Sequence, residues 1–331
     1  MKKTQVALAA LALVASTAVL ADGVTVYGNL EAAYVKGNNT STAFAGDGEW
    51  GASAFGLKGS EDLGGGLTAS FNLEGGLNTN SGAANVQGGT TGLFNRAAWV
   101  AVGGEAGTLK LGHQFSPFIG SFVSTLALAG NNFLVPVLAN AGALDNGGTG
   151  ATATGGFFIP NAASYAFSFG GVSGQVLHSV KNGVDTQQVT AGNLSGAIGA
   201  VSLTAGMSER TDAYRNYVIG GTMPIGDLKL AANYIDHTDK GVGGGNSSTI
   251  TVGASYALTG ATSVGLNYSK TSNKDSDVDP SLTNLSLMHA LSKRTSAYAY
   301  YAHGTNGSGV SYAGSTTGAT SAIGVGVAHS F

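Results

Sequence analysis

The chain has 331 residues, of which 54 are glycine, 10% are charged and none is cysteine. The absence of cysteine excludes a fold held by disulfide bonds. With 15 basic and 18 acidic residues, the formal net charge of −3 argues against nucleic acid or an anionic lipid surface as the main partner, because both need clustered Lys and Arg.

The first 21 residues are predicted to form a signal peptide. Lys2 and Lys3 precede an apolar stretch at 6–20, and the small residue Ala21 follows it. We expect cleavage after Ala21, export, and a single mature domain at 22–331. Beyond this segment, Gly, Ser, Thr and Asn interrupt every apolar run well before the ~20 residues that a membrane-spanning helix needs. A helical membrane protein is therefore not expected.

From residue 24 onward, large apolar residues alternate with small or polar ones, which is the period of a β-strand whose two faces differ. Ile323, Val325 and Val327, for example, alternate with glycine or alanine. We predict an all-β fold, a transmembrane antiparallel β-barrel of about 16 strands, an even number within the range of bacterial barrels. The predicted strands start near residues 24, 51, 67, 94, 108, 163, 173, 185, 199, 214, 227, 247, 262, 281, 295 and 319.

The connections between these strands alternate in length, as they do in barrels with short periplasmic turns and long external loops. The short turns are 62–66, 104–107, 225–226, 258–260 and 292–294. The long loops are 36–51, 78–94, 114–161, 240–246, 271–280 and 304–318. A soluble β-sandwich or β-solenoid also alternates, but its solvent-facing side would carry more charge than the small, sparsely charged face of these strands.

Several segments are similar to one family of membrane proteins. Residues 53–74 read SAFGLKGSEDLGGGLTASFNLE, which closely resembles strands two and three of the general porins of the neisserial and β-proteobacterial kind. Further segments that resemble this family are 24–28, 94–100, 107–112, 290–298 and 327–331.

This resemblance implies a barrel of about 16 strands that assembles as a homotrimer in the outer membrane of Gram-negative bacteria. It implies that the third external loop, here 114–161, folds into the lumen and narrows it. The implied function is passive diffusion of small hydrophilic solutes and ions, with no cofactor.

Charged residues on the lumen side would set the selectivity of such a channel. Alternation with the lipid-facing residues gives six pore-lining candidates, Glu31, Lys58, Glu74, Arg96, Lys110 and Lys229. Arg96 also matches an arginine of the family, whose members carry basic residues opposite an acidic inward loop. Ala54, His113 and Ala328 stand where that family has, or often has, an arginine. A strong transverse field is therefore not expected.

The long loop is almost uncharged, since Asp145 is the only formal charge between Gln114 and Lys181. The constriction candidates on this loop are Phe118, Phe122, Asn131, Asn132 and Asp145. Two interpretations stay open. The loop forms a weakly charged, partly apolar constriction of low ion selectivity that also suits less polar or aromatic solutes, or it packs against the barrel wall or a neighbouring subunit.

Most aromatic residues on the predicted strands are expected in the girdles at the two membrane interfaces, with stacking platforms for sugars as the alternative. They are Tyr27, Tyr34, Trp99, Tyr165, Phe167, Phe169, Tyr217, Tyr234, Tyr256, Tyr268, Tyr298 and Phe331. Phe331 resembles the terminal aromatic residue that the outer-membrane assembly machinery recognises, and simple strand packing is the alternative.

No pattern in the sequence indicates a catalytic or metal site, so we predict no enzyme activity, metal or cofactor. Asp275, Asp277 and Asp279 imitate the start of a calcium loop, but Pro280 and Ser286 stand where such a loop needs Gly and Glu. Loose binding of divalent ions there stays open. So do a hydrolase built from scattered serines and histidines, and a structural or adhesive barrel with a plugged lumen. The sequence does not name the permeating solutes.

Overall fold

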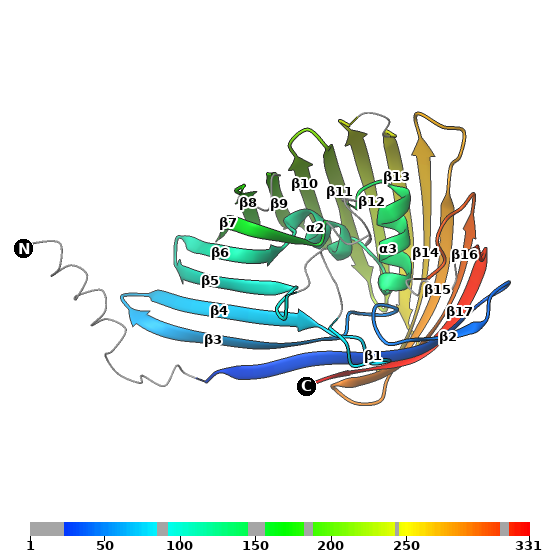
Figure 1. The fold of residues 1–331 in the computed structure, drawn as a ribbon, viewed down its shortest axis with the longest axis horizontal. Helices are drawn as coiled ribbons and strands as arrows, with labels where there is room; N and C mark the ends of the chain where they lie inside the picture. Colours follow the sequence, from blue (N-terminus) through cyan, green and yellow to red (C-terminus); the bar gives the residue numbers. More distant parts are fainter. Residues whose placement is uncertain (1–22, 85–91, 145–155, 182–187, 242–244, 312–317) are drawn as a thin grey trace, which may run out of the picture.

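The computed structural model describes residues 23–84, 92–144, 156–181, 188–241, 245–311 and 318–331. Within these ranges, 17 strands form one sheet, which Figure 1 shows curving around a central space. Sixteen strands of 8 to 13 residues form the barrel wall, and β2, Thr42–Ala45, is a short addition of 4 residues beside β1. The wall strands are β1 Thr25–Gly37, β3 Ala54–Gly64, β4 Leu67–Gly76, β5 Ala97–Gly104, β6 Gly107–Phe115, β7 Phe158–Phe169, β8 Val172–Ser179, β9 Val189–Ile198, β10 Val201–Arg210, β11 Tyr214–Ile225, β12 Leu228–Asp239, β13 Ser247–Ala257, β14 Thr262–Asn273, β15 Ser281–Ala290, β16 Thr295–Thr305 and β17 Ser321–Ser330.

The first and last wall strands pair with each other, and this pairing closes the barrel. β1 is antiparallel to β17 from Asn29↔Ser330 to Gly37↔Ala322, and it pairs with β3 through its first residues. Gly28 and Phe331 exchange both backbone hydrogen bonds, at 3.1 and 3.0 Å. The predicted antiparallel transmembrane barrel is confirmed, and closure leaves no free sheet edge in it.

Strand alternation follows the sequence because the two faces meet different surroundings. Ile323, Val325 and Val327 are 55%, 51% and 47% exposed on the outer face, whereas the neighbouring Ala322 is 2% exposed on the inner face. An apolar outer face is what the hydrocarbon layer requires of a barrel. The parity rule used on the sequence therefore separates lipid-facing from lumen-facing residues.

Most wall strands begin within three residues of their predicted starts, and two differ by more. β7 begins at Phe158 rather than near 163, because a register shift between Gly112 and Gln114 on β6 and a left-handed Asn161 (φ 53°) interrupt the alternation there. β9 begins at Val189 rather than near 185. The sequence also gave no sign of β2.

Short turns and long connections lie at opposite ends of the wall, as predicted. The β3–β4 turn uses Gly64, Gly65 and Gly66 with φ of 78°, 63° and 81°, a conformation that side chains with a Cβ rarely adopt. The connections from β1, β4 and β6 to the next wall strand are long and lie at the other end.

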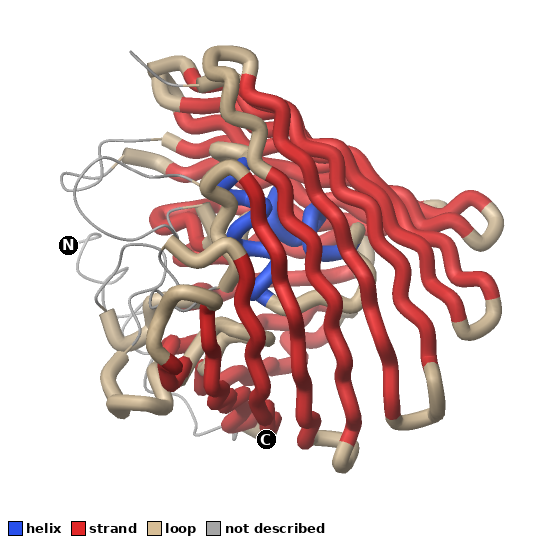
Figure 2. Tube along the Cα trace, turned by 90° about the vertical axis from the view of Figure 1, so that its right-hand side faces the viewer, coloured by secondary structure: helices blue, strands red, loops and turns tan. Residues whose placement is uncertain are grey.

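The β6–β7 connection folds inward and carries two short helices, α2 Pro117–Ser124 and α3 Asn131–Asn140. Pro117 occupies the start of α2, where its missing N–H costs nothing. Figure 2 shows both helices inside the ring of strands, so the predicted inward third loop is confirmed. We call its described residues 116–144 the inner loop. None of the helices in the described ranges is long and apolar enough to span a membrane.

Candidate channel constriction

The inner loop lies directly on the lumen face of the wall formed by β10 to β14. At Gly206 of β10, a Cβ would lie 2.7 Å from the Ser121 hydroxyl oxygen of α2. At Gly265 of β14, a Cβ would lie 2.5 Å from the Leu128 carbonyl oxygen. Both distances are shorter than real Cβ contacts, so the missing side chains are what allow the loop to approach this closely.

Polar side chains of the wall hold the same segment by hydrogen bonds. The Lys229 ammonium donates to the Leu126 carbonyl at 2.9 Å, and the Asn267 amide donates to the Leu128 carbonyl at 3.0 Å. These carbonyls follow α2 in an irregular stretch, where they have no helical partners of their own. The wall therefore satisfies backbone groups that burial would otherwise leave unpaired.

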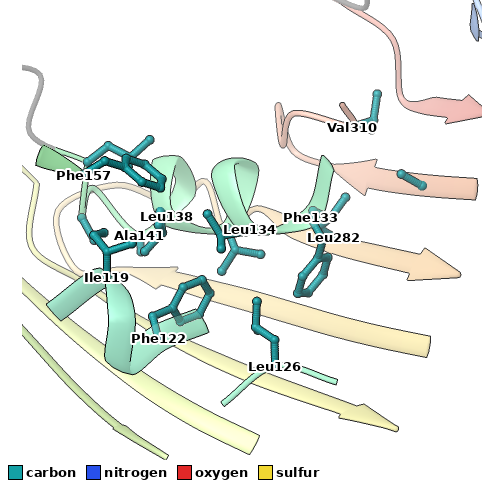
Figure 3. Packing of buried hydrophobic residues seen from close by; sticks show 14 of the residues in the cluster. Ile119, Phe122, Leu126, Phe133, Leu134, Leu138, Ala141, Phe157, Leu282 and Val310 are labelled. Carbon is teal, nitrogen blue, oxygen red and sulfur yellow. The ribbon is translucent and has the colours of Figure 1, made fainter. Parts of the chain in front are cut away.

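The apolar side chains of the inner loop form the main core of the barrel interior. Phe118, Phe122 and Phe133 are 1%, 0% and 0% exposed. Figure 3 shows Phe122 and Phe133 beside Leu138 of α3 and Leu282 of the wall. The interpretation that the apolar loop packs against the barrel wall describes this side of the loop.

The N-terminus of α3 docks on a second inward segment, residues 46–53, which we call the first loop. Asn131 and Asn132 donate their backbone N–H groups to the carbonyls of Trp50 and Glu49 at 3.1 and 2.9 Å. These are two of the N–H groups that a helix leaves without intrahelical partners. The two loops therefore form one unit inside the lumen.

Glu31 holds the first loop in place. Its carboxylate accepts backbone N–H bonds from Glu49, Trp50 and Gly51 at 2.5, 2.9 and 2.8 Å. Several converging N–H donors form a favourable site for an anion. Glu31 faces the lumen side of β1, but it is 1% exposed and thus enclosed by the first loop rather than open to the channel.

Two tyrosines of β16 complete this buried cluster. The Tyr300 hydroxyl donates to the Glu49 carboxylate, and the Trp50 ring packs on Tyr298 with centroids 5.3 Å apart. Tyr298 is 4% exposed on the inner face, so it does not belong to an outer girdle. The alternation in the sequence predicts this position, because Tyr298 is an odd number of residues from the outward-facing Tyr301 and therefore lies on the opposite, inner face of β16.

The opposite lumen wall, formed by β1 and β3 to β6, carries most of the charged candidates. The Arg96 guanidinium pairs with the Glu74 carboxylate at 2.6 Å, and the Tyr27 hydroxyl donates to the other Glu74 oxygen at 2.7 Å. Arg96 also lies over the Phe158 ring at 4.9 Å. This pair is electrically balanced and already hydrogen-bonded.

Lys58 and Lys110 also lie over aromatic rings, but they differ from Arg96 because no described carboxylate pairs with them. The Lys58 ammonium is 4.9 Å from the centroid of Tyr27, and the Lys110 ammonium is 4.4 Å from that of Trp99. Among the described residues, neither forms an ion pair within 4.0 Å. Both contribute positive charge to the lumen.

Trp99 faces the lumen and is therefore an exception among the aromatic residues expected in the girdles. Its neighbours Val100 and Val102 are 61% and 48% exposed on the outer face, whereas Ala97 and Ala101 on the face of Trp99 are 8% and 5% exposed. The same alternation was readable in the sequence. An aromatic residue in a strand belongs to a girdle only if its position in the alternation places its side chain on the outer face.

The constriction candidates of the inner loop fall into three groups. Phe118, Phe122 and Asn132 are buried, Asn131 is partly exposed, and Asp145 lies outside the described residues. At the end of α2, Val123 is 43% exposed and Ser124 is also exposed. The described part of the inner loop thus presents an uncharged, partly apolar surface to the lumen.

Two other predicted features lie at the ends of the barrel. Phe331 pairs with Gly28 of β1 where the barrel closes, and its ring packs over Gly28, where a Cβ would lie 2.4 Å from the ring. Asp275 and Asp279 accept backbone N–H bonds from Asn246 and Asn273 at 2.6 and 3.0 Å, so they organise external loops. No cluster of potential metal ligands occurs in the part of the chain that is described.

Comparisons with known proteins agree with this geometry. Residues 7–309 match the family described as Gram-negative porin. The chain is 29% identical to outer membrane porin protein 32 of Delftia acidovorans, with all of both chains covered.

Solved structures share the fold. The chain is similar to the anion-selective porin of Comamonas acidovorans, with a TM-score of 0.73, 24% identity, and coverage of 93% of this chain and 99% of the other. It is also similar to the trimer form of Vibrio cholerae OmpT, with a TM-score of 0.71, 15% identity, and coverage of 93% and 99%. A closed 16-strand barrel with a narrowed lumen, joined to a match over most of the chain, places this protein in the Gram-negative porin family, as an outer-membrane channel for passive diffusion.

Proposed function

We propose that this porin passes small hydrophilic solutes and ions through a weakly charged constriction and prefers anions modestly. The observation that carries the proposal is the position of Lys58 and Lys110, two lumen cations without a carboxylate partner among the described residues. They face an inner loop whose described part has no charge. The net field is positive but comes from few charges, so we expect low selectivity.

One structural relative is described as an anion-selective porin, which supports the sign of this preference. The preference is expected to be small because Glu74 balances the charge of Arg96 at 2.6 Å. An arginine with a carboxylate at hydrogen-bond distance adds little net field at the centre of the lumen.

The experiment is planar-bilayer recording of the purified protein. Stepwise conductance in KCl is expected, and the zero-current potential in a KCl gradient should show a small anion preference. A lumen plugged by its loops, as in a structural or adhesive barrel, would give no conductance steps. A cation preference would contradict the proposed charge balance.

We also propose that the protein assembles as a homotrimer and acts without enzymatic activity. A similar solved structure is described as a trimer form, which supports self-association. The outer band of exposed apolar side chains would contact lipid or neighbouring subunits. Mass measurement of the detergent-solubilised protein, corrected for bound detergent, tests the trimer, and a monomeric mass would contradict it.

A further inference from the structure

We propose that the Trp99–Lys110 and Tyr27–Lys58 pairs form a transit site for aromatic carboxylates. This inference rests on the proposed function and names a solute class for the channel. The two pairs come from β5 and β6 and from β1 and β3, all on the wall that faces the inner loop.

Strand register brings the two pairs together. Asn72 of β4 is the direct neighbour of Lys58 on one side and of Trp99 on the other. The three residues therefore form one row across the lumen face. Lys110 lies diagonally from Trp99, because Trp99 is paired with Gly112. Direct cross-strand neighbours lie roughly 4.5 to 5.5 Å apart, so the two steps from Lys58 to Trp99 span about 9 to 11 Å, and a solute that moves along this wall meets one pair after the other.

Each pair presents a positive charge and a flat apolar ring at the same place. The ammonium groups lie 4.4 and 4.9 Å from the ring centroids, within the range of a cation–π contact. Such a contact leaves part of each ammonium free to bind a carboxylate. The rings then offer an apolar surface on which the aromatic part of the solute packs.

The surroundings suit an aromatic anion better than a small hydrophilic one. Arg96 does not compete for the carboxylate, because Glu74 already binds it. On the inner loop, Val123 and Ser124 are exposed and uncharged, so they do not repel an aromatic ring. Acetate shares the charge of benzoate but lacks the ring, and benzyl alcohol has the ring without the charge. These three probes separate the two contributions.

The test is the block of single-channel KCl current by each probe. Wild-type protein should bind benzoate about fivefold more tightly than acetate, the factor expected for one added aromatic contact. Trp99→Ala should lower this ratio while acetate block is kept, because only the Tyr27 ring then remains, and Trp99→Phe should restore most of it. Lys110→Gln should weaken block by both anions and leave benzyl alcohol unchanged.

Lys293→Gln, in the exposed β15–β16 turn, is the charge-matched control and should behave as wild type. Each variant is first checked for KCl conductance steps, so a channel that does not conduct reports on the proposed function rather than on this site. Trp99→Phe keeps the test available if Trp99→Ala fails to fold. Equal block by benzoate and acetate in the wild type, or an unchanged ratio in Trp99→Ala, would overturn the inference.

Discussion

Replacing both Lys58 and Lys110 with glutamine is expected to remove most of the anion preference of the channel. An ion on the lumen axis, about 8 Å from each ammonium, interacts with each by about 0.5 kcal/mol in water. Screening at 0.1 M salt, where the Debye length is about 10 Å, reduces the sum to about 0.5 kcal/mol. Anions are then enriched about twofold and cations depleted about twofold, which gives a permeability ratio of about 4.

Salt dependence gives this prediction a second, independent check. At 1 M salt the Debye length is about 3 Å, so the preference should fall almost to one. The assay is the zero-current potential in KCl gradients at both salt levels, with Lys293→Gln as control. A wild-type ratio above about 20, or a double variant that keeps the wild-type ratio, would refute the assignment of the field to these two lysines.

The remaining predictions concern how the inner loop and the barrel are held. Glu31→Gln should loosen the first loop by about 1–3 kcal/mol, seen as greater current noise and faster proteolysis between 46 and 53, whereas Glu105→Gln in a turn should change neither. Gly265→Ala should destabilise the docked inner loop by about 1–3 kcal/mol and alter the conductance, because its Cβ would meet the Leu128 carbonyl at 2.5 Å. Gly260→Ala, with open space around it, is the matched control, and equal behaviour of the two variants would contradict the contact. Phe331→Ser should lower the yield of folded, heat-modifiable barrel on gels, and a similar loss in Phe169→Ser, at an 86% exposed position, would show that the effect is not specific to the terminus.

The wall was predictable because its physics is local. Each strand repeats one rule, with apolar residues toward lipid and small or polar residues toward the lumen. This rule appears in the sequence as a period of two residues. It placed Lys58 and Lys110 on the lumen face, and it would also have placed Trp99 there had it been applied to that residue. For aromatic residues such as Trp99, the face of the strand rather than the residue type decides whether the side chain reaches the girdle.

The lumen contents were not predictable in the same way, because loops have no period. Glu31 has lumen parity, but only the structure shows that the backbone of Glu49 to Gly51 encloses its carboxylate. The glycines that admit the inner loop, such as Gly206, look like any other small lumen residue in the sequence. The role of Gly206 depends on Ser121, which is far away along the chain.

The two interpretations of the apolar loop turn out to describe its two sides. Phe118 and Phe122 are buried against β10 and β11, so one side supplies the energy that keeps the loop inside a water-filled lumen. Val123 and Ser124 lie on the other side and leave it exposed and uncharged. Because apolar burial holds the loop in the lumen, the loop does not need acidic side chains that attract the basic residues of the opposite wall to stay in place. We therefore expect Lys58 and Lys110 to dominate the selectivity, and substitutions at Val123 that keep its size should change solute discrimination less than substitutions at Lys110.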